Sequence, residues 1–253
     1  MESTAAAGPP AVYDRIGIGY RKVRRPDPRL AALIDGALGD ARTVVNVGAG
    51  AGSYESADRE VTAVEPSQVM LDQHPGTRKV KAGAEELPFD DGAFDAAMAV
   101  MTVHHWSDLK RGLAELRRVS RRQAVFTWDP THPRVLWLIE EYLPEIRELE
   151  LSWFTPLSEV TGALGAHTVL PFPIPHDFTD GFQVAHWRRP ESYLDPVVRA
   201  ATSTFATLGP AVVEPGIARL RADLESGEWR RRHAGLLAQE SVDYGYRLVI
   251  AGD

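Results

Sequence analysis

The stretch that decides the fold runs from Val44 to Tyr54 and reads VVNVGAGAGSY. Its first four residues, VVNV, form a short run rich in β-branched side chains, and glycines follow at once, at Gly48, Gly50 and Gly52. Glycine adopts backbone angles that a Cβ resists, and it lets a ligand approach the main chain closely. The start of the helix expected next offers unpaired N–H groups. The stretch therefore predicts a strand, a glycine-rich turn and a ligand site.

Short apolar runs alternate with helical patterns on both sides of this turn. Helical spacing of apolar residues covers 29–38, 109–119 and 135–151, and helical pieces broken by prolines cover 190–240. Strands are expected over 43–47, 61–64, 78–82, 94–100, 124–128, 167–172 and 244–251. Strands joined through helices imply crossover connections and a parallel sheet buried on both faces. The sequence therefore predicts the α/β class.

Composition limits the chemistry that the chain can perform. The 253 residues include no cysteine, which excludes disulfides, thiolate zinc sites and a cysteine nucleophile. The net charge is −7, which favours a small-molecule substrate over nucleic acid, because phosphate contacts need basic faces. The first eleven residues lack the pattern of a signal peptide, and no apolar run approaches the length of a membrane span. We expect a cytoplasmic protein that binds no membrane.

The glycine spacing separates two classes of nucleotide-binding turn. Dinucleotide binders use G-x-G-x-x-G, which would place the third glycine where this chain has Ser53. The observed G-x-G-x-G resembles the first motif of the class I methyltransferases that use S-adenosylmethionine, whose turn holds the amino-acid end of that cofactor. Glu65, at the end of the 61–64 run, is suited to accept hydrogen bonds from a ribose diol. Because nicotinamide enzymes use the same device, Glu65 does not choose between the two cofactors.

Two further stretches extend the resemblance to residues 44–106. AGAEELPFDDGAFD at 82–95 is similar to the methyltransferase loop that holds adenine and to the F-D pair that opens the fourth strand. VHHW at 103–106 follows that strand, as in these enzymes. The resemblance implies a Rossmann-like, seven-stranded, mostly parallel sheet with helices on both faces and an inserted helical cap. We expect a disordered tail over 1–12 and a single domain over 13–253, with cap elements near 13–28, 131–160 and 173–240.

The chain also departs from the family pattern. Many relatives carry an acid where Asn46 stands and an aspartate where Gly83 stands. The adenine amine is then expected to meet a backbone carbonyl or Glu85. The segment from Tyr13 to Pro26 also resembles these enzymes, and Tyr20 with Arg24 or Arg25 is suited to meet the cofactor carboxylate. The cofactor residues implied are Tyr20, Arg25, Asn46, Gly48, Ala49, Gly50, Gly52, Glu65, Pro66, Ala84, Glu85 and Met101.

The acceptor side of the site is predicted from residues that follow the strands. Methyl transfer needs alignment of three atoms, and it needs a base only when the nucleophile carries a proton. His104 and His105 follow the fourth strand, so we expect one of them to act as the base and the other to pack. No metal is expected. Polar and aromatic residues after the fifth and sixth strands predict an apolar substrate pocket that includes Trp128, His132, His176, Phe178 and Trp187.

Three functions remain open on the sequence alone. The first is a small-molecule methyltransferase of secondary metabolism that converts S-adenosylmethionine to S-adenosylhomocysteine, with methylation at oxygen or carbon favoured and nitrogen also allowed. The second is a non-catalytic protein that binds the same cofactor. The third, a nicotinamide-dependent oxidoreductase, is disfavoured by Ser53 and by the E-x-L-P-F block from Glu85 to Phe89. The substrate, the methylated atom and the oligomeric state are not specified by the sequence.

Overall fold

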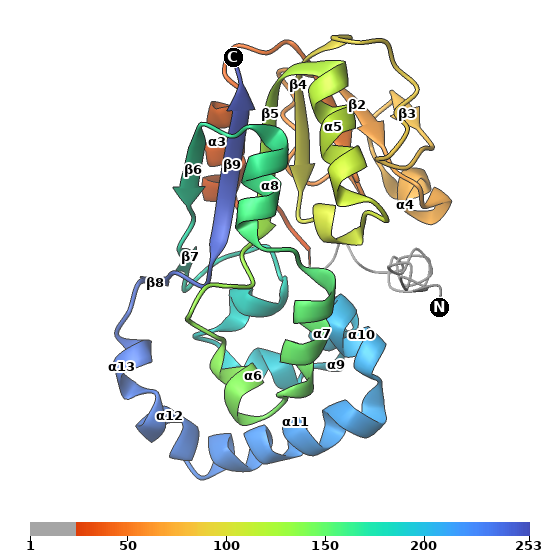
Figure 1. The fold of residues 1–253 in the computed structure, drawn as a ribbon. Coiled ribbons are helices and arrows are strands. Elements are labelled where there is room, and N and C mark those ends of the chain that lie inside the picture. Colours follow the sequence, from red (N-terminus) through yellow and green to blue (C-terminus); the bar gives the residue numbers. More distant parts are fainter. Residues whose placement is uncertain (1–23) are drawn as a thin grey trace, which may run out of the picture.

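The computed structural model describes residues 24–253, and a seven-stranded sheet forms its centre (Figure 1). The strand order is β3-β2-β1-β4-β5-β9-β6, and β9 runs antiparallel to both of its neighbours. The strands are β1 Thr43–Val47, β2 Glu60–Val64, β3 Lys79–Val80, β4 Phe94–Val100, β5 Ser120–Trp128, β6 Thr168–Pro171 and β9 Tyr246–Gly252. The predicted seven-stranded, mostly parallel sheet is confirmed.

The strand order reverses at β1, which pairs with β2 on one side and with β4 on the other. Val45 is opposite Thr62 of β2 and Ala97 of β4. In open α/β sheets, ligands bind at the carboxyl ends of the strands that flank such a reversal. Here these ends lead directly into Gly48 after β1 and Met101 after β4. The fold therefore places the glycine-rich turn beside the residues that follow β4.

Helices cover both faces of the sheet (Figure 1). They are α3 Pro28–Ala37 on one face and α5 Leu109–Val119 with α8 Leu157–Leu164 on the other, while α4 Gln68–Gln73 follows β2. Successive strand residues point to opposite faces, so Met98 packs in the core on the α3 side and Ala99 in the core on the α5 side. Asp27 and Asp108 accept hydrogen bonds from the first turns of α3 and α5 and thereby fix where these helices begin.

A helical layer lies beyond the carboxyl ends of the parallel strands, and we call residues 137–153 and 183–237 the cap (Figure 1). Aromatic packing holds it together: the Trp137 ring lies 4.9 Å from Trp229 and 5.5 Å from Tyr193. Its elements are α6 Trp137–Glu141, α7 Glu145–Trp153, η2 Gln183–His186, η3 Pro190–Leu194, α9 Pro196–Ala200, α10 Ser203–Leu208, α11 Pro210–Glu225, α12 Glu228–Arg232 and α13 Ala234–Leu237. A small pair of strands, β7 Ile174–Pro175 and β8 Ser241–Val242, joins it to β9.

Proline explains the main differences from the predicted helices. The helix expected over 135–151 is two helices, because Pro144 cannot continue α6 and stands at the start of α7. Pro196 and Pro210 occupy the first turns of α9 and α11, where the missing N–H costs nothing. Pro215 lies inside α11 and does not interrupt it, contrary to the expectation. The extent of the single domain and of the tail over 1–12 stays a prediction.

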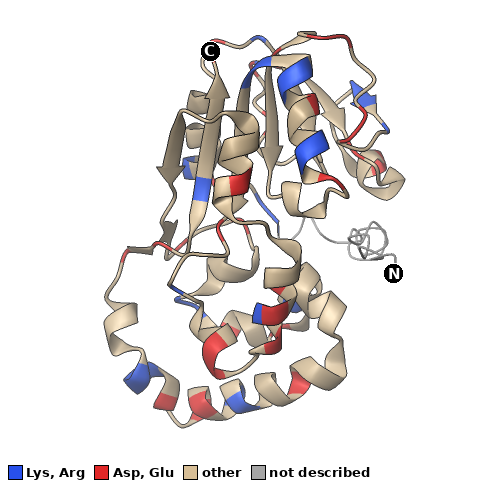
Figure 2. Cartoon of the chain, viewed as in Figure 1, with Lys and Arg blue, Asp and Glu red and all other residues tan. Residues whose placement is uncertain are grey.

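Two arginine-rich stretches, 117–122 and 230–232, carry ion pairs to acidic residues; Figure 2 colours both kinds of residue along the chain. Arg118 pairs with Glu115 and Asp91, and Arg232 pairs with Asp223 and Glu141. Arginines of both stretches are therefore ion-paired within the described chain. Over residues 24–253, no helix is both long and apolar enough to cross a membrane.

Candidate active site

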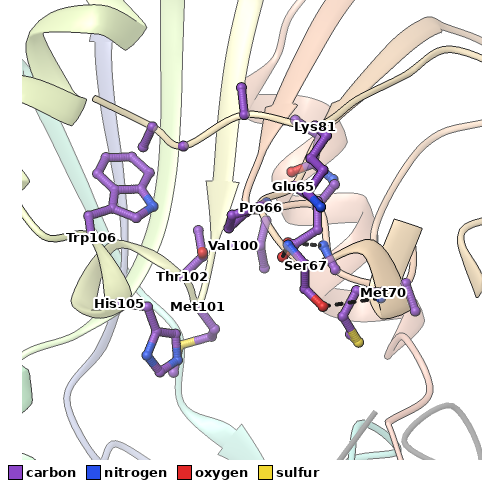
Figure 3. A pocket seen from close by; sticks show the side chains of 18 of the residues that line it. Glu65, Pro66, Ser67, Met70, Lys81, Val100, Met101, Thr102, His105 and Trp106 are labelled. Atoms are coloured by element: carbon purple, nitrogen blue, oxygen red, sulfur yellow. Dashed lines mark hydrogen bonds between the residues drawn. The ribbon is translucent and has the colours of Figure 1, made fainter. Parts of the chain in front are cut away.

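A cavity of about 420 Å³ opens at the carboxyl ends of β1, β2 and β4, where the strand order reverses (Figure 3). We call it the first cavity. Glu65, Ser67 and Met70 lie on one side and His105 and Trp106 on the opposite side (Figure 3), and the glycine-rich turn also lines the cavity. Its volume lies in the range of small-molecule and cofactor sites. The predicted ligand site is therefore a formed hollow at the predicted edge of the sheet.

The three glycines of the turn serve different purposes. All three have positive φ, +74° at Gly48, +55° at Gly50 and +84° at Gly52, so the tight turn itself requires them. A Cβ on Gly48 would overlap the Thr102 side chain, and one on Gly52 would lie 2.9 Å from Pro75 Cδ. A Cβ on Gly50 would meet only Met70 Cε, at an ordinary 3.4 Å. Gly48 and Gly52 thus permit internal packing, whereas Gly50 leaves the cavity wall open.

Glu65 braces the glycine-rich turn from the neighbouring strand. Its carboxylate accepts hydrogen bonds from the backbone N–H of Gly50, at 2.9 Å, and of Ser67, at 3.0 Å. The side chain lines the first cavity and the residue is only 8% exposed. Glu65 therefore stands where the ribose contact was predicted, and it also fixes the shape of the turn.

Asn46 offers a buried acceptor to the first cavity. Its Nδ2 donates to Glu55 Oε1 at 2.8 Å, while its Oδ1 is buried and has no partner among the residues that the structure describes. An acceptor left unpaired away from water costs about 1–3 kcal/mol. A ligand that brings an N–H donor into the cavity would satisfy this atom, which is what the ammonium group of an amino acid provides.

Glu85 links the loop at 82–95 to the turn after β4. Its Oε1 accepts hydrogen bonds from the backbone and hydroxyl of Ser107, at 2.7 and 2.9 Å, and from the Asp108 N–H at 3.2 Å. Although burial alone would raise the pKa of Glu85, these hydrogen bonds hold it below its usual value. The carboxylate is thus engaged in positioning the wall of the cavity.

The structure gathers most of the predicted cofactor residues around the first cavity. Those that line it are Asn46, Gly48, Ala49, Gly50, Glu65, Pro66, Ala84, Glu85 and Met101. Gly52 lies behind the turn, against His74 and Pro75. Arg25 is exposed, and its neighbour Arg24 lines the cavity in its place, whereas Tyr20 lies outside the described residues. Further lining residues that the sequence analysis missed are Ser67, Gln68, Val69, Met70, Lys81 and Thr102. Most of these residues are neighbours of the recognised motifs in the sequence, and that proximity could have indicated that they line the site.

A second, smaller cavity of about 70 Å³ lies between the sheet and the cap. Arg24 and Met101 line both cavities, so they mark the place where the two approach each other. Met101 has φ +51°, a left-handed conformation that is uncommon outside glycine and that often marks a functional site. The other lining residues are His104, Glu150, Trp153, Phe154, Phe182, Gln183, Ala201, Thr202, Ser203, Thr204 and Tyr246.

The two adjacent histidines line different cavities. The centres of their rings are 3.8 Å apart, with His105 on the first cavity and His104 on the second. His104 stacks on Phe154 at 4.0 Å, and its Nδ1 is buried without a partner in the described chain. Burial lowers the pKa of His104 well below its usual value, helped by His105 and Arg24, and lowers the pKa of His105 to about 4. Both rings are therefore neutral at pH 7, and a neutral imidazole can accept a proton.

The residues predicted to bind substrate are not among those that line the two cavities of the described chain, so their role in substrate binding stays a prediction. Phe178 and Trp187 are fully buried core residues, because the cap covers the loops that carry them. His132 and His176 lie beside the carboxylates of Asp243 and Glu240. Trp128 contacts Phe154, which lines the second cavity; their ring centres are 5.0 Å apart in an edge-on arrangement.

Comparisons with known proteins agree with this geometry. The sequence model of the methyltransferase domain family matches residues 45–127. A solved structure from Anabaena variabilis, described as a methyltransferase from an antibiotic biosynthesis pathway, is 33% identical, with a TM-score of 0.84 over 91% of this chain and 99% of that chain. The chain belongs to the class I S-adenosylmethionine-dependent methyltransferases. This assignment decides against the nicotinamide-dependent alternative.

Curated relatives of this methyltransferase match it over a shorter range. An uncharacterized methyltransferase of Mycobacterium tuberculosis is 34% identical over 110 residues, which are 40% of this chain and 45% of the relative. The malonyl-[acyl-carrier protein] O-methyltransferase of Pseudescherichia vulneris is 32% identical over 121 residues, which are 44% of this chain and 48% of the relative. The chain thus spans about half the length of the curated relatives that it matches.

The first cavity of this methyltransferase fits S-adenosylmethionine. Asn46 Oδ1 is a buried acceptor for an ammonium group, Gly50 leaves room for close approach, and Glu65 presents a carboxylate. These residues would hold the amino-acid end and the ribose, with Ala84 and Trp106 among the walls for the base. When bound, S-adenosylmethionine supplies an electrophilic methyl group on its sulfonium.

Proposed function

We propose that this methyltransferase methylates a small molecule of secondary metabolism, whose acceptor atom is an oxygen or carbon and enters the second cavity. The observation that carries the proposal is that Met101 and Arg24 line both cavities. A cofactor in the first cavity and an acceptor in the second would therefore meet at these two residues. The description of the Anabaena variabilis relative as part of antibiotic biosynthesis supports the metabolic setting.

His104 is the proposed base at this junction, and His105 is the proposed wall of the cofactor site. His104 lines the second cavity, and its buried Nδ1 has no partner in the described chain. Because burial lowers its pKa, the ring is neutral at pH 7 and its Nδ1 can accept the hydrogen bond of an acceptor hydroxyl. The same low pKa makes the imidazole a weak base, so the proton would move to it together with methyl transfer and not before it. The stacked Phe154 ring restricts the orientation of the imidazole.

A labelling experiment tests the proposal. The wild-type protein is incubated with methyl-deuterated S-adenosylmethionine and a bacterial metabolite extract, and products are sought by mass spectrometry. We expect a small molecule that gains one labelled methyl, and a fall of roughly 10²–10⁴ in turnover for His104→Gln. The non-catalytic alternative would instead give binding of S-adenosylhomocysteine by calorimetry but no labelled product from any fraction.

A further inference from the structure

The second cavity contains a carboxyl group that the proposed chemistry does not use. Glu150 extends from α7 and lines this cavity together with His104 and Tyr246. Its Oε2 is buried and has no hydrogen-bond partner among residues 24–253, and its Oε1 lies 3.4 Å from Gln183 Nε2. Gln183 is itself held through a hydrogen bond that its Oε1 accepts from Thr204. One oxygen of the carboxyl is thus buried without a partner, on a residue that is half-buried overall.

Two arginines near Glu150 have partners of their own. Arg147, three residues earlier on α7, donates from Nη2 to the carbonyl of Pro130 and lies over the Trp128 ring at 5.5 Å, while its Nη1 is buried without a hydrogen-bond partner in the described chain. Arg24 pairs with Asp180 through Nε, 2.5 Å from Oδ1. Glu150 forms no ion pair with any described residue within 4.0 Å. Burial raises its pKa to about 8, although Arg147 pulls it down in part.

Aromatic side chains line the same cavity as the carboxyl. Phe182 already lies under the Arg24 guanidinium at 5.7 Å, and Phe154 is stacked against His104. Trp153 and Tyr246 supply the two remaining aromatic walls of the cavity. The faces of such rings attract cations, and a buried carboxylate gains most from a partner of opposite charge. A carboxyl and rings in one cavity are the features that bind an ammonium group.

We propose that the second cavity recognises a positively charged amine on the substrate, with Glu150 as its counter-ion and Trp153 and Tyr246 as its walls. This inference rests on the proposed function, because it takes the second cavity as the acceptor site. The amine is the recognition group and the methylated atom is a separate one. The like charge of Arg24 is offset by its ion pair with Asp180.

The charge of Glu150 makes amine binding dependent on pH. The groups that face or flank it are Arg24 with Asp180, Arg147, His104 and Tyr246. His104 is neutral, and burial raises the pKa of Tyr246, so Glu150 is the group that changes charge near neutrality. An amine cation binds the ionised carboxylate, so binding at about pH 7 should release a proton from Glu150. Affinity should rise as the pH increases from about 6 to 8.

Three probes of similar shape test the inference: phenethylamine, 2-phenylethanol and phenylacetate. Each is titrated into the protein saturated with S-adenosylhomocysteine, and binding is followed by calorimetry and by tryptophan fluorescence, since Trp153 lines the cavity. We expect the amine to bind at least about tenfold more tightly than the alcohol, and the anion to bind least. Calorimetry in buffers of different ionisation enthalpy should detect proton release with the amine only.

Glu150→Gln keeps the side-chain shape and should abolish both the preference for the amine and the proton release. Glu148→Gln is the matched control, because Glu148 is exposed on the same helix. Equal binding of amine and alcohol by the wild type, no binding of the amine, or a preference that survives in Glu150→Gln would overturn the inference. If S-adenosylhomocysteine itself failed to bind, the proposed function would fall instead, so the two failures are distinguishable.

Discussion

Asn46 donates a hydrogen bond from Nδ2 to Oε1 of Glu55, 2.8 Å away, and His74 Nε2 lies 2.9 Å from the same oxygen. The family resemblance implies an acid at the position of Asn46, and this contact places the Glu55 carboxyl directly beside the amide. Asn46 Oδ1 has no partner in the described chain and can accept a hydrogen bond from a ligand. We therefore infer that Glu55 and Asn46 together take the role of that acid.

Replacement of Glu55 should therefore weaken binding of the amino-acid end of the cofactor. We expect Glu55→Gln to reduce S-adenosylmethionine affinity by about 1 kcal/mol, the size of one hydrogen-bond or short-range charge contribution. 5′-Methylthioadenosine, which lacks the amino-acid group, serves as the control ligand and should bind unchanged. Equal losses for both ligands in calorimetry would show that Glu55 only stabilises the fold.

The glycines of the turn should respond differently to alanine. Gly50→Ala should fold, since its Cβ meets only the tip of Met70, at a cost of about 1–2 kcal/mol for the left-handed backbone. Gly48→Ala should lower the melting temperature much further, because its Cβ overlaps Thr102. Shortening Thr102 to glycine in the Gly48→Ala background should recover part of the loss. Similar melting temperatures for Gly48→Ala and Gly50→Ala would contradict this assignment.

Glu150 should make the folded state less stable as the pH rises. Its folded pKa is raised from 4.5 to about 8, so between these values the folded state holds a proton that the unfolded chain has lost. Raising the pH through this window costs up to about 1.4 kcal/mol per unit. The melting temperature of Glu150→Gln relative to wild type should therefore increase from about pH 5 to pH 8. A difference independent of pH would mean that the carboxyl is already ionised in the folded protein.

His105 should act in the opposite direction. Its folded pKa of about 4 lies below the ordinary 6.5, so protons bind the unfolded chain first and stability is lost as the pH falls through that interval. We expect His105→Gln to lose less stability than wild type between about pH 7 and pH 4.5 in urea titrations. Parallel losses in both proteins would assign the acid sensitivity to other groups.

The sequence predicts the sheet well and the cap poorly, for physical reasons. The strands over 43–47 and 94–100 were predicted with their observed bounds, because their apolar runs end at sharp turns. The placement of β9 between β5 and β6 depends on tertiary packing, and no local sequence pattern indicates it. The helix α8 was missed although Leu157, Val160 and Leu164 recur at helical spacing before Gly165.

The same distinction applies to the site. The first cavity is built mainly from short motifs, so residues such as Asn46 and Gly50 were found from spacing alone. The second cavity combines α7, η2, α10 and β9, which are far apart in the sequence. Glu150 lies in the run ELELSW, whose pattern alone indicates a solvent-exposed helix face. The burial of its Oε2 depends on the folded cap and could not be predicted without the tertiary structure.

The most direct test of the account is a calorimetric titration of S-adenosylhomocysteine into the wild type and Glu65→Ala, with Glu60→Ala as the exposed control at the other end of β2. We expect one site per chain in the wild type, the same affinity in Glu60→Ala, and a loss of about 1–3 kcal/mol in Glu65→Ala. Unchanged affinity in a folded Glu65→Ala protein would contradict the assignment of the first cavity to the cofactor.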